Sequence, residues 1–260
     1  MMLDLGKKRR RELLRRTPLD AAARELLQQR LFCASHFTTD QLAELEGLIQ
    51  IFLHEKTFEG CNGQVIDDEI RLVIAGHACL LLLGREPEPY PALDSILVYP
   101  KAFAVNHQEE LQEGVVLEEE QEMLGESWQQ GALVLSWEDV QADLADPETG
   151  CNVILHEFAH QVDEQSGGAD GTPLLESKDD YARWAEVMSE HFEQLGQAVE
   201  QEEETFLDPY GAESPAEFFA TITESFLLLP MDMRHFHPAL YAELRRFYRQ
   251  DPVLGFAENP

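Results

Sequence analysis

The stretch that decides the fold is NVILHEFAHQV at residues 152–162, directly after the turn sequence DPETG at residues 146–150. Its apolar residues predict a mostly buried helix that ends before Gly167 and Gly168. Within it, His156 and His160 are four residues apart, so both imidazoles project from one face. Burying two neutral histidines and a carboxylate in an apolar helix is costly unless these groups have a metal or other partners. The segment therefore predicts a buried helix with a functional polar cluster.

The histidine spacing fits a metal ion. On one helical face His156 and His160 can grip a single Zn²⁺ ion at roughly 2.0 to 2.1 Å. Glu157 beside them can take a proton from the zinc-bound water and later deliver it to a leaving amine. The pattern His-Glu-x-x-His therefore predicts a zinc-dependent peptidase of the zincin type, with Glu157 as its catalytic base.

A zincin site needs a third protein ligand, and the three-histidine version is absent. Asp163 and Ser166 occupy the positions where that pattern has glycine and histidine. A carboxylate from a later helix is therefore expected, and we favour Glu217. A rival explanation is that Ser214 and Glu217 form a helix-capping box. The other candidates for the ligand are Glu186, Glu190 and Glu224.

Outward from this segment the chain is mostly helical. Apolar spacing, capping residues and prolines predict helices at residues 40–56, 67–83, 177–200, 215–229 and 239–249, the last of these closing the chain. Short runs rich in Val, Leu and Ile predict strands at residues 93–99 and 132–137. The acidic residues 109–126 are expected to form a surface loop or edge structure. The expected fold class is α+β, a mostly helical zincin-like domain with a small β-sheet beside the zinc-binding helix.

Residues 1–260 are expected to form one metallopeptidase domain, because no linker rich in Gly, Ser or Pro divides them. Within it, residues 1–16 form a basic N-terminal segment and residues 17–90 are a candidate helical sub-lobe. The first segment holds seven of the chain's nineteen basic residues, although the formal net charge is -31. The rest is thus strongly acidic, which argues against direct nucleic acid binding and favours basic proteins or peptides as partners.

The location of the protein is expected to be cytoplasmic. Four cysteines lie far apart without a C-x-x-C pair, which disfavours a disulfide framework. The basic start is not followed by the apolar core of a secretory signal. The longest apolar stretch, residues 72–83, is too short for membrane insertion.

Two segments together resemble a known family. HEFAHQVD at residues 156–163 and YGAESPAEFFA at residues 210–220 are similar to the Mlc titration factor A family of zinc metallopeptidases, over most of the chain. The zinc region alone also resembles the catalytic domain of anthrax lethal factor.

The resemblance implies a role for each matching residue. His156, His160 and Glu217 would bind one Zn²⁺ ion, Glu157 would be the general base, and Tyr210 would donate a hydrogen bond to the developing oxyanion.

Two further carboxylates are candidates for contacts behind the ligands. Asp163 lies one turn beyond His160 and can orient a ligand imidazole, and Glu224 lies two turns beyond Glu217 on the same face. The alternative of equal weight is that Asp163 lies at the helix end and faces solvent.

The resemblance also implies what the protein acts on. Its substrate would be a peptide or protein, with aminopeptidase activity included, and its partner the transcriptional repressor Mlc, whose binding regulates glucose phosphotransferase genes. The competing hypothesis is a non-catalytic protein that sequesters a repressor, with a mainly structural zinc site. Glu157 favours the enzyme, because a structural zinc site has no need of a general base.

Overall fold

In the part of the chain that the structure describes, the sheet consists of three parallel strands in the order β1-β2-β3. The computed structural model describes residues 2–85, 89–101 and 131–257. Strands β2 (Ser95–Tyr99) and β3 (Ala132–Ser136) confirm the two predicted strands, and each buries alternate side chains. The predicted loop at residues 109–126 lies outside the described residues.

Strand β1 (Thr57–Gly60) was not expected from the sequence. It pairs with β2 at one edge of the sheet, and three of its four residues are exposed. So short and exposed a strand has no alternation of apolar and polar residues, which is the signal that predicts a strand.

The predicted helices are present, and several others join them. The predicted ranges correspond to α3 (Thr39–Glu55), α4 (Asp68–Leu80), α7 (Val153–Asp163), α8 (Lys178–Glu200), α9 (Pro215–Leu228) and α11 (Pro238–Tyr248). The structure adds α1 (Met2–Arg15), α2 (Ala21–Arg30), α6 (Trp137–Ala145), α10 (Pro230–Phe236) and α12 (Pro252–Ala257). Short 3₁₀ helices are η1 (Ala34–His36), η2 (Pro147–Thr149), η3 (Glu164–Ser166) and η4 (Pro209–Ala212).

The prediction that residues 239–249 form the last helix is wrong, because α12 follows. Pro230 ends α9 as expected, yet it also occupies the first turn of α10. Proline suits that position, since the first residues of a helix have no intrahelical partner for their N–H groups. The same residue type therefore both stops one helix and starts the next.

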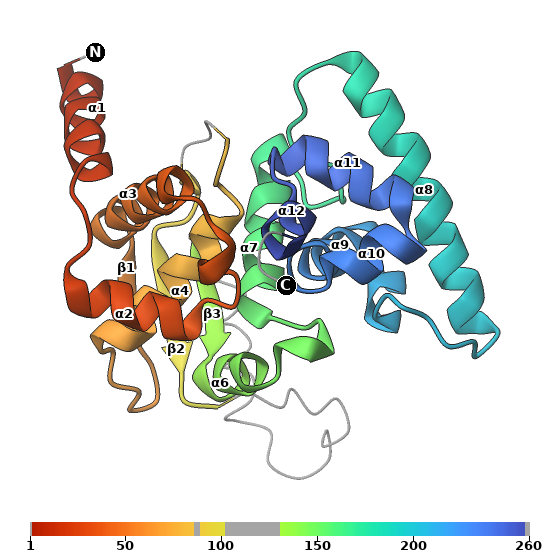
Figure 1. The fold of residues 1–260 in the computed structure, drawn as a ribbon, viewed down its shortest axis with the longest axis horizontal. Coiled ribbons are helices and arrows are strands. Elements are labelled where there is room, and N and C mark those ends of the chain that lie inside the picture. Colours follow the sequence, from red (N-terminus) through yellow and green to blue (C-terminus); the bar gives the residue numbers. More distant parts are fainter. Residues whose placement is uncertain (1, 86–88, 102–130, 258–260) are drawn as a thin grey trace, which may run out of the picture.

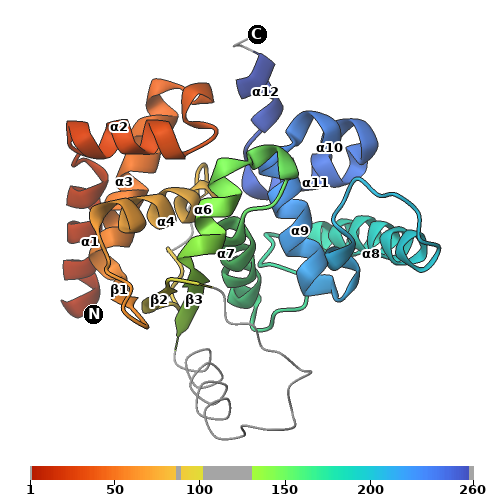
Figure 2. The same ribbon diagram turned by 90° about the horizontal axis from the view of Figure 1, so that it is seen from below.

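Helix α7 lies in the middle of the molecule. In Figure 1 the sheet and α1 to α4 lie on one side of it, and α8 to α12 lie on the other. Figure 2, turned by 90°, shows α9 beside α7 and α6 near the end of β3. Helix α7 packs against α4, α9 and β3. It is therefore held by elements from both halves of the chain.

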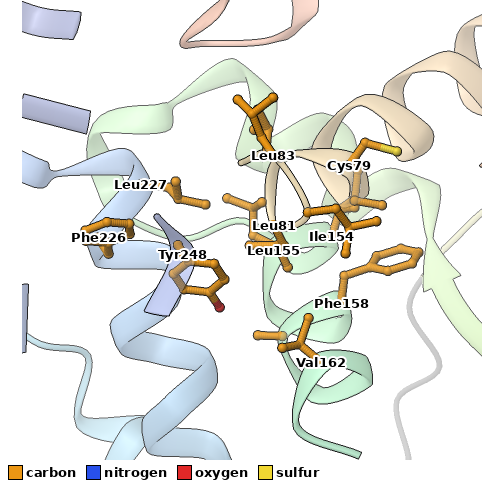
Figure 3. Close-up of a cluster of buried hydrophobic side chains, with 14 of the residues drawn as sticks. Cys79, Leu81, Leu83, Ile154, Leu155, Phe158, Val162, Phe226, Leu227 and Tyr248 are labelled. Carbon is orange, nitrogen blue, oxygen red and sulfur yellow. The ribbon is translucent and has the colours of Figure 1, made fainter. Parts of the chain in front are cut away.

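The apolar face of α7 belongs to the main core. Ile154, Leu155, Phe158 and Val162 are at most 1% exposed, and Figure 3 shows the first two beside Leu81, which follows α4. Each large side chain buried in this way contributes about 1.5 to 3 kcal/mol to stability. This packing fixes the helix while its other face carries His156 and His160.

The N-terminal helix α1 packs on α3. The guanidinium of Arg11 donates two hydrogen bonds of 2.7 Å to the carboxylate of Glu55. Gly47 in α3 lets the helices approach closely, because a Cβ there would lie 2.7 Å from the Arg15 carbonyl oxygen. The basic segment is thus attached along part of its length.

Residues 17–90 contact the remaining chain through β1, which pairs with β2, and through α4, which packs against α7. On this basis we propose that residues 1–260 form one domain, with residues 17–90 as its helical sub-lobe. None of the helices described is both long and apolar enough to span a membrane. The four cysteines are free.

Candidate metal centre

Helix α7 aligns the two histidines. Asn152 caps its N-terminus, since the side-chain oxygen accepts a 3.0 Å hydrogen bond from the Leu155 N–H. His156 lies about one helical turn further on and His160 about two turns, and their ring centroids are 4.9 Å apart. Their Nε2 atoms are 3.3 Å apart. Both rings therefore present a nitrogen to the same point.

Helix α9 brings Glu217 to that point. Its first turn is capped by Ser214, whose Oγ accepts a hydrogen bond from the Glu217 N–H at 3.2 Å. The Glu217 side chain makes no return bond among the hydrogen bonds described. Its Oε2 instead lies 2.9 Å from Nε2 of His156 and 3.4 Å from Nε2 of His160. Capping and contact with the histidines are thus compatible, because they use different atoms of Glu217.

The three side chains form a donor set for a metal ion. One ligand atom from each of His156, His160 and Glu217 lies within 4.8 Å of the others. Two imidazole nitrogens and one carboxylate oxygen are ligands that suit zinc and leave a fourth position open. In the ranges that the structure describes, no other group of His, Cys, Asp and Glu meets this condition. The competing candidates Glu186 and Glu190 are exposed on α8.

Glu224 lies behind His156. It is buried two turns along α9, and its Oε1 is 2.7 Å from Nδ1 of His156. The other carboxylate oxygen accepts a hydrogen bond from the Asn152 N–H at 2.5 Å. Burial favours the neutral ring, but Glu224 outweighs it and raises the pKa of His156 to about 9. Glu224 thereby orients the ring that faces Glu217.

Glu157 is largely enclosed beside His156. Burial is the main reason why the pKa of its carboxyl rises to about 7, and the charges of Glu217 and Glu224 add to the effect. A carboxyl group with a pKa near neutrality can accept and release protons at physiological pH.

Tyr210 lies in η4, near His156. Its ring centroid is 5.9 Å from that of His156, and the side chain is 47% exposed. Asp208 holds the turn, because its Oδ1 accepts a 2.9 Å hydrogen bond from the Tyr210 N–H. Burial and the nearby Glu217 carboxylate raise the pKa of the phenol, which therefore keeps its proton as a donor.

Asp163 makes a hydrogen bond to the loop after α7, and none of its described hydrogen bonds reaches the histidine rings. It is fully buried at the end of α7, and its Oδ2 accepts a 2.6 Å hydrogen bond from the Gly171 N–H. The Gly171 carbonyl accepts a bond from Trp184, and a Cβ on Gly171 would lie 2.3 Å from the Pro215 carbonyl oxygen. Asp163 thus fixes the loop that packs against the start of α9, two residues before Glu217.

Two supporting residues were missed in the sequence. Asn152 both caps α7 and donates to Glu224, and its place before an apolar run is a signal that would have found it. Asp143 accepts a 2.7 Å hydrogen bond from the Val153 N–H at the same helix end. No local pattern marks Asp143, because its partner is ten residues away and not one helical turn.

A cavity of about 480 Å³ adjoins His156. Tyr210 is among its lining residues, and so are three aspartates, Asp139, Asp143 and Asp208. Of the residues described above, His156, Tyr210 and Glu224 line this cavity.

Two imidazoles and a carboxylate that converge beside a second carboxylate are typical of a metallopeptidase. The comparisons with known proteins specify this class. The chain belongs to the glucose-regulated metallo-peptidase M90 family, which it matches over residues 5–249. Membership of a metallopeptidase family implies a catalytic metal, usually zinc.

Relatives cover most of the chain. An uncharacterized protein of Synechocystis, slr2042, is 42% identical over 95% of this chain and 90% of its own length. Mlc titration factor A of Escherichia fergusonii is 32% identical over 86% of this chain and 84% of its own. The protein of the same name from Serratia proteamaculans is 33% identical over 77% of each.

Proposed function

We propose that the protein is a peptidase in which His156, His160 and Glu217 hold one zinc ion. The observation that carries the proposal is the approach of three ligand atoms to within 4.8 Å of one another, beside Glu157. When bound, zinc supplies Lewis acidity that polarises a peptide carbonyl and lowers the pKa of water. The residues around the ligands then have separate tasks.

Glu157 is the proposed general base. It accepts the proton of the attacking water and transfers it to the leaving amine. The raised pKa of its carboxyl supports both steps, because a group with a pKa of about 7 both accepts and releases a proton readily near pH 7.

Tyr210 is the proposed hydrogen-bond donor to the oxyanion. Its ring lies near His156, and its phenol keeps its proton at neutral pH. A donor placed where negative charge develops stabilises the transition state more than the ground state.

Glu224 and Asp163 are proposed to position the ligands. Glu224 does so by holding Nδ1 of His156. Asp163 acts on Glu217 through Gly171 and the start of α9, and not through His160. Partners of this kind fix ligand orientation and raise metal affinity.

The cavity beside His156 supports an aminopeptidase. Its aspartates favour a positively charged group, and the free amino terminus of a peptide is such a group. Aminoacyl p-nitroanilides should therefore be cleaved faster than their N-acetylated counterparts. Equal rates, or faster cleavage of the acetylated compounds, would remove this specificity while leaving the peptidase intact.

The test of the mechanism is the pair of wild type and Glu157→Gln, both loaded with zinc. We expect the variant to retain zinc and to lose about 10²- to 10⁴-fold in the rate of peptide hydrolysis. Zinc content and hydrolysis are measured on the same samples. Equal hydrolysis by the two proteins would refute the role of Glu157, and no hydrolysis by a zinc-loaded wild type would favour the non-catalytic, repressor-sequestering alternative.

We further propose a cytoplasmic location and binding of a repressor of the Mlc type, with a role in transcription regulation. The name of the relatives, Mlc titration factor A, supports this partner. The formal net charge of -31 suits a basic, DNA-binding protein. Calorimetric titration with a purified Mlc repressor should give saturable binding that weakens between low and moderate salt. An absence of binding at both salt concentrations would exclude the partner.

A further inference from the structure

A second cavity lies away from the metal centre and is lined by several arginines. It has a volume of about 460 Å³ and shares no lining residue with the cavity beside His156. Its lining residues come from three parts of the chain. These are the turn after α4, the segment before α8 with the first turns of α8, and the end of α11. Four of its lining residues are arginines: Arg85, Arg183, Arg246 and Arg249. Such a cluster is unexpected in a chain with a net charge of -31.

Three of the four arginines have carboxylate partners. Glu243, which is 3% exposed, accepts hydrogen bonds from Arg183 at 2.9 Å and from Arg246 at 2.8 Å. Asp180 also accepts from Arg183 at 2.7 Å. Arg249 is paired with Glu176. These guanidinium groups are neutralised within the protein and form the rim of the cavity.

Arg85 differs from the other three. Among the described residues its guanidinium has no hydrogen bond or ion pair, and its Nη1 atom is fully buried without a partner. The group lies over the Phe247 ring, with its central carbon 4.1 Å from the ring centroid. An enclosed cation that lacks an anion is costly, because the ring replaces only part of its hydration.

The charges around the cavity indicate what would complete it. Among the described residues that line the cavity, four guanidinium groups face three carboxylates, those of Glu176, Asp180 and Glu243, so one positive charge is left over. A ligand with a single carboxylate would balance this positive charge. A phosphate dianion would bring two negative charges and leave the cavity with a net negative charge. A guanidinium also matches a carboxylate in shape, since it can donate two parallel hydrogen bonds.

The remaining walls are apolar. Leu174, Leu175 and Phe247 line the cavity, and Leu174 is 58% exposed at its surface. Such walls suit the hydrocarbon part of a small molecule or the last side chain of a peptide.

We propose that this cavity binds a carboxylate carried on an apolar body, with Arg85 as the residue that pairs with it. The ligand is either a free carboxylic acid or the C-terminal carboxylate of a peptide. The site is separate from the metal centre and does not depend on the proposed peptidase function.

The experiment uses the zinc-loaded full chain and calorimetric titration with N-acetyl-leucine. N-acetyl-leucinamide, which lacks the charge, is the matched control. A short peptide ending in leucine, tested as acid and as amide with the Glu157→Gln protein to prevent turnover, distinguishes a peptide terminus from a free acid. We expect the acids to bind at least about tenfold more tightly than the amides.

Variants assign the binding to this cavity and not to the zinc ion. Arg85→Met, which keeps the aliphatic stem, should weaken acid binding about tenfold or more. Leu174→Glu adds a charge at an exposed position and should weaken it about threefold or more, whereas Leu174→Gln should leave it unchanged. Circular dichroism and zinc content verify that each variant is folded.

Three results would overturn the proposal. The first is equal affinity of acid and amide. The second is unchanged acid binding in both Arg85→Met and Leu174→Glu. The third is binding that appears only after Glu86→Gln and Glu88→Gln, because the chain's own carboxylates would then be the partners of Arg85.

Discussion

His156 has contacts on both ring nitrogens. Nδ1 faces Glu224 at 2.7 Å and Nε2 faces Glu217 at 2.9 Å, and a carboxylate accepts hydrogen bonds. In the metal-free protein the ring therefore holds two protons, in agreement with a pKa of about 9. A zinc ion at Nε2 has to displace one of them. Metal binding at this residue is thus coupled to proton release.

At pH 7 we expect zinc binding to release about one proton from His156, because a metal ligand must be deprotonated and the pKa of this ring lies above 7. The measurement is calorimetric zinc titration in two buffers with different ionisation enthalpies. Glu224→Gln removes the charge that raises the pKa, so this variant should release fewer protons and bind zinc more weakly. If the wild type released no protons, His156 would not hold two protons in the metal-free protein.

Glu217 shows what a residue pattern leaves open. The sequence offered two roles for it, metal ligand and member of a capping box. In the structure its backbone N–H donates to the cap residue Ser214, and its side chain contacts the histidines. The position of Asp163 within its helix does not predict its partner Gly171, eight residues later, whose N–H donates a hydrogen bond to the Asp163 carboxylate. Local spacing predicts contacts within one helix, and contacts between elements depend on the fold.

At the scale of elements, the loop between α7 and α8 follows the histidine helix α7 and packs against the start of α9, the helix that carries Glu217. Gly171 lies against the start of α9, and its φ of +77° is in the region that favours glycine. The loop is held on both sides, by Asp163 and by Trp184.

Gly171→Ala should destabilise the protein by at least about 2 kcal/mol, because the new Cβ is strained at this φ and clashes with the Pro215 carbonyl oxygen. Zinc affinity should fall as well, since α9 carries Glu217. Gly168→Ala is the matched control in the same loop, where a Cβ meets no atom within 4 Å. Urea unfolding with and without zinc measures both effects. Similar stabilities of the two variants would disprove the close contact.

Helix α4 buries His77, which predicts a pH dependence of stability. The ring is 0% exposed, and burial lowers its pKa to about 4, below the value of 6.5 in the unfolded chain. Because the folded state resists protonation, stability is retained above pH 6.5 and lost as the pH falls toward 4. Between pH 7 and pH 5 the loss due to His77 is about 2 kcal/mol.

The measurement is urea unfolding at both pH values in EDTA, which removes metal effects. His77→Gln should lose about 2 kcal/mol less than the wild type over this interval. His235→Gln, at a position exposed to solvent, should behave like the wild type. Parallel losses in wild type and His77→Gln would contradict the burial of an uncharged His77.

At the scale of the whole molecule, sequence patterns predicted the parts that form the core and missed those at its margins. The long apolar helices and the strands β2 and β3 carry periodic signals, whereas β1, α10 and α12 are short, and β1 is held in place by its pairing with β2. The same holds for the arginine cavity, whose residues come from three distant segments. The central arrangement is the convergence of α7 and α9, which brings residues 61 positions apart within 2.9 Å.

The most direct test of the account is anomalous diffraction at the zinc edge from crystals of the full chain grown with one equivalent of zinc. We expect one strong peak per chain, within bonding distance of Nε2 of His156, Nε2 of His160 and the carboxylate of Glu217. A peak elsewhere, or a peak bound by the histidines with Glu217 turned away to Ser214, would contradict the proposed metal centre.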